Sequence, residues 1–121
     1  MSKKIFKKYQ LDAKKNIDKM TVFQNELDEF ASNISKKVIS GGKILTCGNG
    51  GSSCDAQHFA AELLIRLRSN INRKSIPAIF LGMDIATITA CANDYGYNKV
   101  FSRSLEGVGK ENDVLICYST S

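Results

Sequence analysis

The stretch "TCGNGGSSCDAQHFAAEL", residues 46–63, decides the fold expected for this chain of 121 residues. It starts at the end of an apolar run, "KILTC" at 43–47, which has the character of a short buried strand. Three glycines and two serines follow, and apolar residues then recur at helical spacing from about Ser53 to Leu67. A strand, a glycine loop and a helix in this order predict the first unit of a parallel α/β fold.

The rest of the chain continues the same alternation. The runs "PAIFLG" at 77–82 and "VLICYS" at 114–119 are apolar without alternation, which indicates strands covered on both faces. Helical patterns separate them, one over residues 85–93 and one over 99–108. Asp84 and Asn98 precede these helices and are suited to cap their first turns. The predicted fold class is therefore α/β, a parallel sheet flanked by helices.

Residues 20–40 predict an amphipathic helix that ends at the glycine pair 41–42. Apolar residues recur there at steps of four, three, four and four, on one helix face: Phe23, Leu27, Phe30, Ile34 and Val38. This helix lies outside the strand–helix repeat and has little core of its own to cover. We expect its apolar face to pack against the same helix of a neighbouring chain, giving a homo-oligomer.

The net charge of +5 comes from the first 20 residues, which contain seven lysines and two aspartates. The remaining residues have equal numbers of basic and acidic side chains, so a basic nucleic-acid-binding body is excluded. The lysine-rich segment is either a solvated helix face, which we favour, or a contact surface for an acidic partner. It has no apolar signal region, and no apolar run approaches the roughly 18 residues of a membrane span. We therefore expect a cytoplasmic protein.

The four cysteines show neither a disulfide framework nor the spacing of a zinc site. Cys47 and Cys117 lie in apolar runs, and we expect both to be small buried hydrophobic residues. The chain stops at "STS", directly after its third predicted strand, where a crossover usually follows. We therefore expect the 121 residues to be the N-terminal part of a longer protein.

The glycine loop "CGNGGSS" lies where parallel sheets bind ligands, beyond the carboxyl end of a strand. Glycines allow backbone amides to approach a ligand closely, and Ser52 and Ser53 add hydroxyl groups at a helix N-terminus, which favours anions. The segment "YSTS" at 118–121 would add a second hydroxyl loop. The two loops suit a phosphate ester. The alternative is a tight strand-to-helix turn with a serine cap.

His58 and Glu62 are four residues apart on the predicted helix and therefore share one face. An imidazole and a carboxylate at this spacing can supply half of a tetrahedral zinc site. The alternatives are a surface His–Glu pair or a histidine satisfied in the core. Glu62 lies about 14 Å along the helix from the glycine loop by helical rise. That separation suits the reacting end of a long sugar phosphate.

Three blocks of the sequence resemble the phosphoheptose isomerases of the sugar-isomerase (SIS) fold: "GGKILTCGNGGSSCDAQHFAAELLIR", "CANDYGYNKVFSR" and "GKENDVLICYSTS". The resemblance runs from about residue 20 to the last residue. It implies a flavodoxin-like parallel sheet in three layers with an N-terminal helix and the C-terminal part missing. Residues 1–121 would form the N-terminal portion of a single SIS domain, with a helical segment over 1–40 and the start of the core over 41–121.

The resemblance also implies an activity. These enzymes convert sedoheptulose 7-phosphate to D-glycero-D-manno-heptose 7-phosphate through an enediol, towards the heptose of lipopolysaccharide or capsule. They bind zinc, one ion per subunit, and are homotetramers with shared active sites. Carried over by position, Glu62 is the catalytic acid/base, and His58 and Glu62 are metal ligands. The implied substrate-binding residues are Asn49, Gly50, Gly51, Ser52, Glu62, Asn93, Asp94, Ser119, Thr120 and Ser121.

The other two metal ligands of the family, a glutamine and a histidine, belong to a later helix that this sequence does not contain. The sequence therefore holds half of the implied site. One alternative is a non-catalytic SIS-fold regulator that binds a replication initiator, and another is a sugar-phosphate sensor. The pair His58 and Glu62 favours the enzyme, because a pure binding module does not need it.

Overall fold

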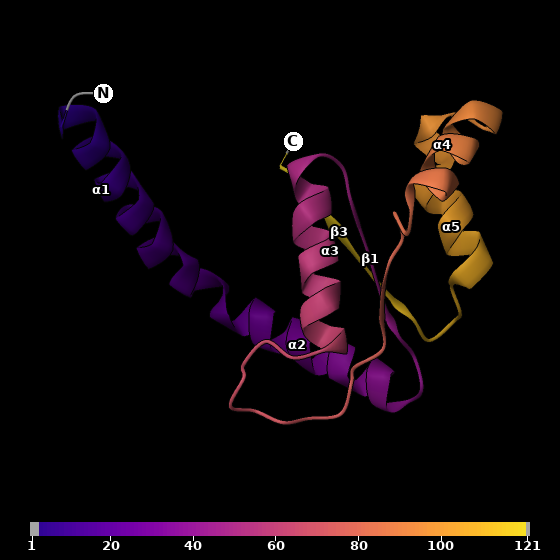
Figure 1. The fold of residues 1–121 in the computed structure, drawn as a ribbon. Helices are drawn as coiled ribbons and strands as arrows, with labels where there is room; N and C mark the ends of the chain where they lie inside the picture. Colours follow the sequence, from indigo (N-terminus) through magenta and orange to yellow (C-terminus); the bar gives the residue numbers. More distant parts are fainter. Residues whose placement is uncertain (1–2, 121) are drawn as a thin grey trace. The chain divides into compact units, whose positions relative to one another are not determined.

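The computed structural model describes residues 3–120, so Ser121 lies outside the described residues. The chain divides into two compact units, Met1–Asn33 and Ile34–Ser121. The elements in chain order are α1 (Lys3–Lys19), the 3₁₀ turn η1 (Met20–Phe23), α2 (Gln24–Ile39), β1 (Ile44–Gly48), α3 (Gly51–Leu64), β2 (Ala78–Phe80), α4 (Ile85–Asp94), the 3₁₀ turn η2 (Tyr97–Lys99), α5 (Val100–Val108) and β3 (Val114–Tyr118) (Figure 1).

The three strands form one parallel sheet in the order β2-β1-β3. One apolar cluster lies on the face covered by α3 and the end of α2, where Ile44 and Ala60 are buried and Ile34 and Val38 pack against them. A second cluster lies on the opposite face, where Leu45 packs with residues of α5. Helices thus cover both faces of the sheet, and the predicted three-layer α/β fold is confirmed.

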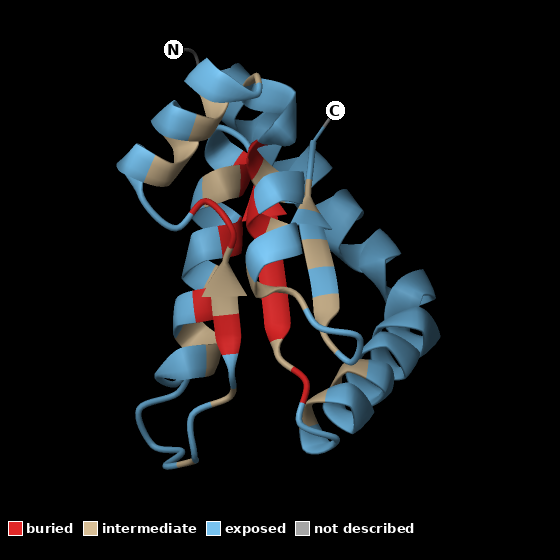
Figure 2. Cartoon of the chain, turned by 90° about the vertical axis from the view of Figure 1, so that its right-hand side faces the viewer, coloured by how far each residue is buried: buried red, intermediate tan, exposed pale blue. Residues whose placement is uncertain are grey.

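The central strand β1 is buried along its whole length, whereas β3 is not (Figure 2). Exposure alternates along β3, and Leu115 and Cys117 are the exposed residues. Both pair with β1 residues of the α5 face, but the side chains of α5 pack over β1 and β2. The prediction that Cys117 is buried is therefore wrong for the described chain, while the same prediction for Cys47 is confirmed.

Helix α3 is shorter than the apolar pattern indicated. It begins at Gly51 and ends at Leu64, and Leu67 is 72% exposed. The guanidinium of Arg73 donates hydrogen bonds to the carbonyls of Glu62 at 2.6 Å and Leu63 at 2.8 Å. Arg73 thereby satisfies carbonyls that another helical turn would have used, and the helix stops one turn early.

The two predicted caps have different outcomes. Asp84 caps α4 as expected, since its carboxylate accepts hydrogen bonds of 2.8 Å from both the amide and the hydroxyl of Thr87. Asn98 does not cap α5. It lies inside η2, and Lys99 occupies the N-cap position of α5 without a side-chain cap. The tighter 3₁₀ turn shifts the start of the following helix by one residue.

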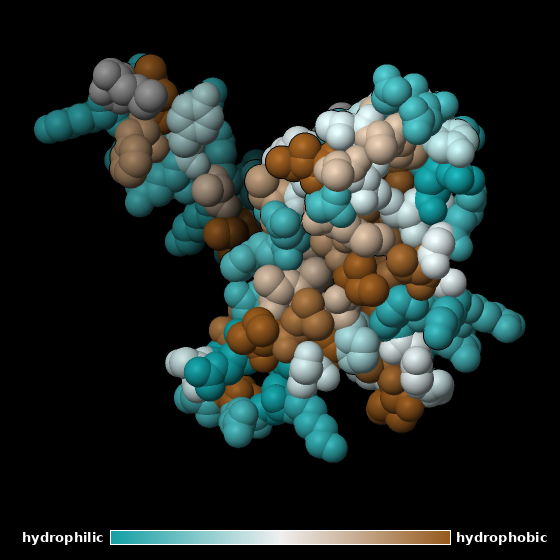
Figure 3. Space-filling model, turned by 45° about the vertical axis from the view of Figure 1, so that its right-hand side comes forward, coloured by the Kyte–Doolittle hydropathy of each residue, from teal (hydrophilic) through white to brown (hydrophobic). Residues whose placement is uncertain are grey.

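The N-terminal unit has no buried residue among those described in α1 and η1, and its lysines are all exposed. Apolar side chains of this unit lie at the surface beside charged ones (Figure 3), among them Phe23, Leu27 and Phe30, which are 46–55% exposed. The apolar face predicted for residues 20–40 is therefore divided. Ile34 and Val38 pack against the buried cluster of the sheet, whereas Phe23, Leu27 and Phe30 belong to the N-terminal unit and are about half exposed. Within residues 3–120 no helix combines the length and apolarity needed to cross a membrane.

Strand β1 and helix α3 meet at a very short distance. A Cβ atom on Gly48 would lie 2.4 Å from the carbonyl oxygen of Ser52. Two residues earlier, the buried hydroxyl of Thr46 donates a 2.9 Å hydrogen bond to the carbonyl of Ala56. The first turns of α3 are thus fixed against the end of the strand.

The other end of the sheet is held by Asp113, whose side chain is only 6% exposed. Its carboxylate accepts hydrogen bonds from the backbone amides of Lys43 at 2.9 Å and Lys110 at 2.7 Å, and it forms an ion pair with the Lys43 ammonium. Burial raises the pKa of Asp113, but these hydrogen bonds and the Lys43 charge outweigh it and lower the pKa below its ordinary value of 3.8. Asp113 therefore joins the starts of β1 and β3.

Replacing Gly48 by alanine should destabilise the fold by about 1–3 kcal/mol, the usual cost of forcing an extra atom into a packed site. The Ser52 carbonyl oxygen that the new Cβ would meet belongs to the backbone, so it cannot rotate away as a side chain could. Urea denaturation followed by circular dichroism measures the change. Gly51→Ala is the matched control, because nothing lies within 4 Å of a Cβ at that position and its φ is not positive. Equal stability of the two variants would contradict the close strand–helix contact.

Asp113→Asn should lower the free energy of unfolding at neutral pH and leave it nearly unchanged in strong acid. A carboxyl whose pKa is lower in the folded than in the unfolded chain stabilises the fold above the unfolded pKa, near 3.8. That contribution disappears as the pH falls through the lower, folded pKa. Urea denaturation across the acid range, with the exposed Glu111→Gln as control, measures it. A loss of the same size at every pH would show that ionisation of Asp113 is not involved.

Candidate functional site

The carboxyl ends of β1 and β3 lie side by side, with Gly48 and Tyr118 as register partners. The chain runs from β1 to β2 on one side and then crosses to β3 on the other. The loops that begin at Asn49 and Ser119 therefore leave the sheet from paired positions, at the point where the strand order reverses. Open parallel sheets bind ligands in this crevice. The structure thus brings together the two loops that the sequence singled out.

The glycine loop is accessible and its backbone requires glycine. Gly50 has a φ of +56° and precedes α3 directly, in a region that residues with a side chain rarely adopt. Asn49, Gly50 and Gly51 are exposed, and Ser52 is buried in the first turn of α3 with 8% of its surface accessible. A helix N-terminus presents backbone amides and a positive dipole end, which favour an anion. After the end of the neighbouring strand β3, Ser119 and Thr120 are also exposed.

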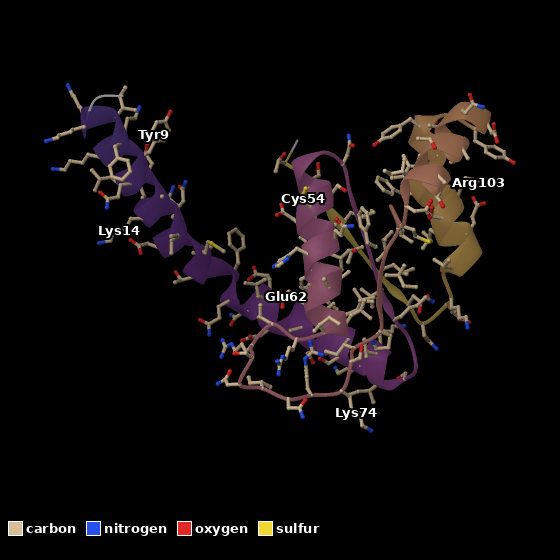
Figure 4. All side chains as sticks on the ribbon, in the orientation of Figure 1. Tyr9, Lys14, Cys54, Glu62, Lys74 and Arg103 are labelled. Atoms are coloured by element: carbon tan, nitrogen blue, oxygen red, sulfur yellow. The ribbon has the colours of Figure 1, made fainter. Side chains whose placement is uncertain are left out.

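The outer face of α3 presents the predicted metal and catalytic residues to an open groove of about 570 Å³. His58 Nε2 lies 3.2 Å from Glu62 Oε1, and the side chains of these residues are 75% and 27% exposed. Figure 4 shows Glu62 on this helix. The groove is lined by Asp55, His58, Phe59, Glu62, Leu63, Leu67, Arg73, Ile76 and Tyr118. The i, i+4 spacing therefore does what the sequence predicted and places both groups at one surface.

The separation of the two donor atoms suits a shared zinc ion. Ligand distances of about 2.0–2.2 Å in a tetrahedral site place two neighbouring donors about 3.3–3.6 Å apart. His58 and Glu62 nearly match this at 3.2 Å. Two donors are half of the usual set, and no group of three or more His, Cys, Asp or Glu suited to a metal occurs in the part of the chain that the structure describes. The pair therefore has the geometry of two ligands of a tetrahedral zinc site.

Sequence reasoning missed Asp55 and Tyr118, which share the groove with the His58–Glu62 pair. Burial and the charge of Asp55 raise the pKa of the Tyr118 hydroxyl above its ordinary value, which keeps that hydroxyl a proton donor. The ring of Tyr118 packs against Phe59 with centroids 6.1 Å apart. Asp55 could have been identified from the sequence, because it lies three residues before His58 on the same helix. Tyr118 could not, because only strand pairing brings it to α3.

Asn93 and Asp94 lie exposed at the end of α4, and the Asn93 amide donates a 2.9 Å hydrogen bond to the Asp94 carboxylate. The contact from this segment to the glycine loop is made by Tyr97, whose hydroxyl donates to Asn49 Oδ1 at 2.7 Å. Tyr97 thereby restrains the side chain of a predicted substrate residue. Nothing in the sequence marked this contact, because the two residues are 48 positions apart.

One protein family matches this chain, described as the SIS domain, over residues 8–121. Among curated relatives, a phosphoheptose isomerase of Chlorobaculum parvum is 49% identical over 106 residues, 85% of this chain and 51% of the relative. A phosphoheptose isomerase of Cytophaga hutchinsonii is 53% identical over 98 residues, 81% of this chain and 50% of the relative. The chain thus spans about half the length of these curated relatives.

Solved structures agree with the fold. A phosphoheptose isomerase from Francisella tularensis superposes with a TM-score of 0.87 at 33% identity, covering 100% of this chain and 63% of the other. A phosphoheptose isomerase from Neisseria gonorrhoeae superposes with a TM-score of 0.82 at 32% identity, covering 98% of this chain and 60% of the other. The resemblance stated from the sequence blocks is confirmed by both kinds of comparison.

Proposed function

This chain belongs to the SIS domain family, and we propose that its protein is an aldose–ketose isomerase of sugar phosphates. The substrate proposed is sedoheptulose 7-phosphate and the product D-glycero-D-manno-heptose 7-phosphate, made in the cytoplasm for lipopolysaccharide or capsule. The relatives named phosphoheptose isomerase support this assignment. The observation that carries it is the His58–Glu62 pair, which faces a groove next to two loops suited to phosphate.

The phosphate group is proposed to bind between the paired strand ends. The amides at the start of α3 and the hydroxyl of Ser52 would hold it from one side, and Ser119 and Thr120 from the other. Ser121 is proposed to join them. Asn49, held by Tyr97, would orient the sugar hydroxyls together with Asn93 and Asp94. Substrate recognition then comes from loops, while the reacting groups stand on a helix.

The isomerisation moves one proton between neighbouring carbons. The proposed base is the Glu62 carboxylate, which takes a proton from C1 of the ketose as the C1–C2 enediol forms. The same carboxyl returns the proton to C2, giving the aldose. The side chain of Glu62 is 27% exposed and is therefore accessible from the groove. The guanidinium of Arg73 donates a hydrogen bond to the Glu62 carbonyl and so restrains this end of α3. General acid–base catalysis of this kind contributes about 10²–10⁴ in rate.

We propose that His58 and Glu62 also hold a zinc ion, which supplies positive charge to the oxygens of the enediolate when it is bound. Glu62 would then serve as both ligand and base, two roles that compete because a metal-bound carboxylate is a weaker base. The groups of this chain that remain free to move protons in the groove are the Asp55 carboxylate and the Tyr118 hydroxyl. They would exchange protons with the substrate oxygens.

We also propose a homotetramer, with the exposed apolar residues Phe23, Leu27 and Phe30 at a contact between subunits. Phe23 at the end of η1 and Leu27 and Phe30 in α2 are large apolar side chains about half exposed, and such a group is costly to leave in water. Light scattering of the complete protein should show four times the subunit mass. A monomer at micromolar concentration would refute the oligomer.

Glu62→Gln in the complete protein should lower kcat for sedoheptulose 7-phosphate by about 10²–10⁴. The amide keeps the size of the side chain and removes the base. KM should change little, because the proposed phosphate loops lie about 14 Å along the helix from Glu62. Steady-state kinetics gives both constants. Turnover close to that of the unchanged enzyme would reject the catalytic assignment and favour a non-catalytic SIS-fold binding protein.

Two further variants separate the proposed roles. His58→Ala should lower zinc affinity, measured by metal titration, and added zinc should restore part of the activity. Glu106→Gln is the matched control, since Glu106 forms a similar exposed pair with Arg103 at 3.3 Å on α5, away from the groove. Glu106→Gln should change neither kcat nor KM. Loss of activity in Glu106→Gln as large as in Glu62→Gln would show that charge removal alone explains the effect.

A further inference from the structure

A tyrosine hydroxyl joins the two segments that contain the proposed sugar-binding residues. Tyr97 begins η2, and its hydroxyl donates a 2.7 Å hydrogen bond to Oδ1 of Asn49, the first residue after β1. Asp94 ends α4 three positions before Tyr97. The length is the usual one for a hydrogen bond between a hydroxyl and an oxygen. Both partners belong to the compact unit Ile34–Ser121, so the contact arises from the fold of this unit.

The turn on which Tyr97 stands is restrained. Gly96, directly before it, has a φ of +91°, a backbone conformation that favours glycine. On the other side of Gly96, the ring of Tyr95 lies under the guanidinium of Arg103, whose Cζ is 4.4 Å from the ring centroid. Arg103 comes from α5 and is labelled in Figure 4. The backbone before Tyr97 is therefore fixed, and so is the direction from which its hydroxyl reaches the glycine loop.

The bond to Tyr97 determines which end of the Asn49 amide is left for a ligand. An asparagine side chain has a carbonyl oxygen that accepts hydrogen bonds and an NH2 group that donates two. In Asn49 the oxygen is turned to Tyr97, so the NH2 group, on the other side of the same carbon atom, points away from it. Without a fixed partner the amide could rotate about its last bond and present either end, because this torsion has a broad preference.

We propose that Tyr97 is a positioning residue that fixes the Asn49 amide as a hydrogen-bond donor to an oxygen of the bound sugar phosphate. The identity of this ligand rests on the proposed function. The carbonyl, hydroxyl and phosphate oxygens of a sugar phosphate all accept hydrogen bonds, so an NH2 group matches each of them. A reversed amide would turn its oxygen toward the same acceptors and repel them. Tyr97 acts on the ligand only through Asn49.

Tyr97→Phe in the complete protein should raise KM for sedoheptulose 7-phosphate by roughly 2–12-fold, the range that one neutral hydrogen bond contributes to an equilibrium constant. The kcat should stay nearly unchanged, because the reacting groups are untouched. Tyr95→Phe is the matched control, since it removes a hydroxyl two residues away and keeps the ring beside Arg103. Thermal unfolding confirms that both variants are folded. An unchanged KM in Tyr97→Phe, or an equal rise in Tyr95→Phe, would overturn the positioning role.

A double-mutant cycle separates positioning from a general effect on the fold. Asn49→Ala should raise KM at least as much as Tyr97→Phe does. Adding Tyr97→Phe to Asn49→Ala should raise KM no further, because the amide that the tyrosine positions is gone. Additive increases would show that Tyr97 acts elsewhere and would reject the proposal.

The variant Asn49→Asp tests the direction of the amide. It keeps an acceptor for the Tyr97 hydroxyl and loses both donors of the NH2 group. KM should therefore rise at least as much as in Asn49→Ala. An Asn49→Asp enzyme with the KM of the unchanged protein would show that Asn49 does not donate to the substrate.

A binding measurement distinguishes failure of this proposal from failure of the proposed function. Calorimetric titration with sedoheptulose 7-phosphate uses the complete protein carrying Glu62→Gln, in which turnover should be slow, with and without Tyr97→Phe. The Kd should rise by a factor within the range expected for KM. A protein that loses affinity in this way but has no isomerase activity before any substitution would uphold the positioning role and reject the isomerase. An active isomerase whose Kd and KM do not respond to Tyr97→Phe would reject the positioning role alone.

Discussion

The close contact between the end of β1 and the first turn of α3 is the constraint from which the rest of the site follows. The backbone of Gly48 lies against the Ser52 carbonyl where no side chain fits, and Thr46 ties the strand to Ala56. These contacts set the direction in which α3 leaves the strand. The N-terminus of α3 therefore lies at the carboxyl end of β1. The helix face with His58 and Glu62 follows further along α3, in a direction that these contacts determine.

Parallel pairing of β1 with β3 is the second constraint on the site, because it determines which β3 side chains lie at the groove. At one end of the pair Asp113 joins the two strand starts through Lys43, and at the other end Gly48 and Tyr118 are opposite each other. A slip of one residue would turn every β3 side chain to the other face of the sheet. Tyr118 would then leave Phe59 and the groove, and Cys117 would leave Cys47. A single ion pair far from the crevice thus helps to determine which groups meet inside it.

Local and distant interactions contribute differently to the chemistry. The two donor atoms of His58 and Glu62 are brought to 3.2 Å by helix geometry alone, since one turn separates them. The groove around them needs Tyr118 from β3 and Arg73 from the loop after α3. Arg73 also ends the helix within one turn of Glu62, so the length of α3 and the wall of the groove depend on the same guanidinium.

The sequence alone was sufficient for features that depend on neighbours along the chain. The apolar runs located three strands, the glycines after "KILTC" located the loop, and the spacing of His58 and Glu62 placed them on one helix face. Asp84 was recognised as a cap because its partner Thr87 is three residues away. The resemblance of three short blocks to phosphoheptose isomerases likewise needed only the order of residues, and the comparisons bear it out.

Only the tertiary structure decided the contacts between distant segments, because no local pattern encodes them. Arg73 shortens α3 against its apolar periodicity. The bond from Tyr97 to Asn49 and the contact of Cys47 with Cys117 join residues separated by 48 and 70 positions. Such pairs meet only once strand order and register are established, since these bring the two ends of each contact together.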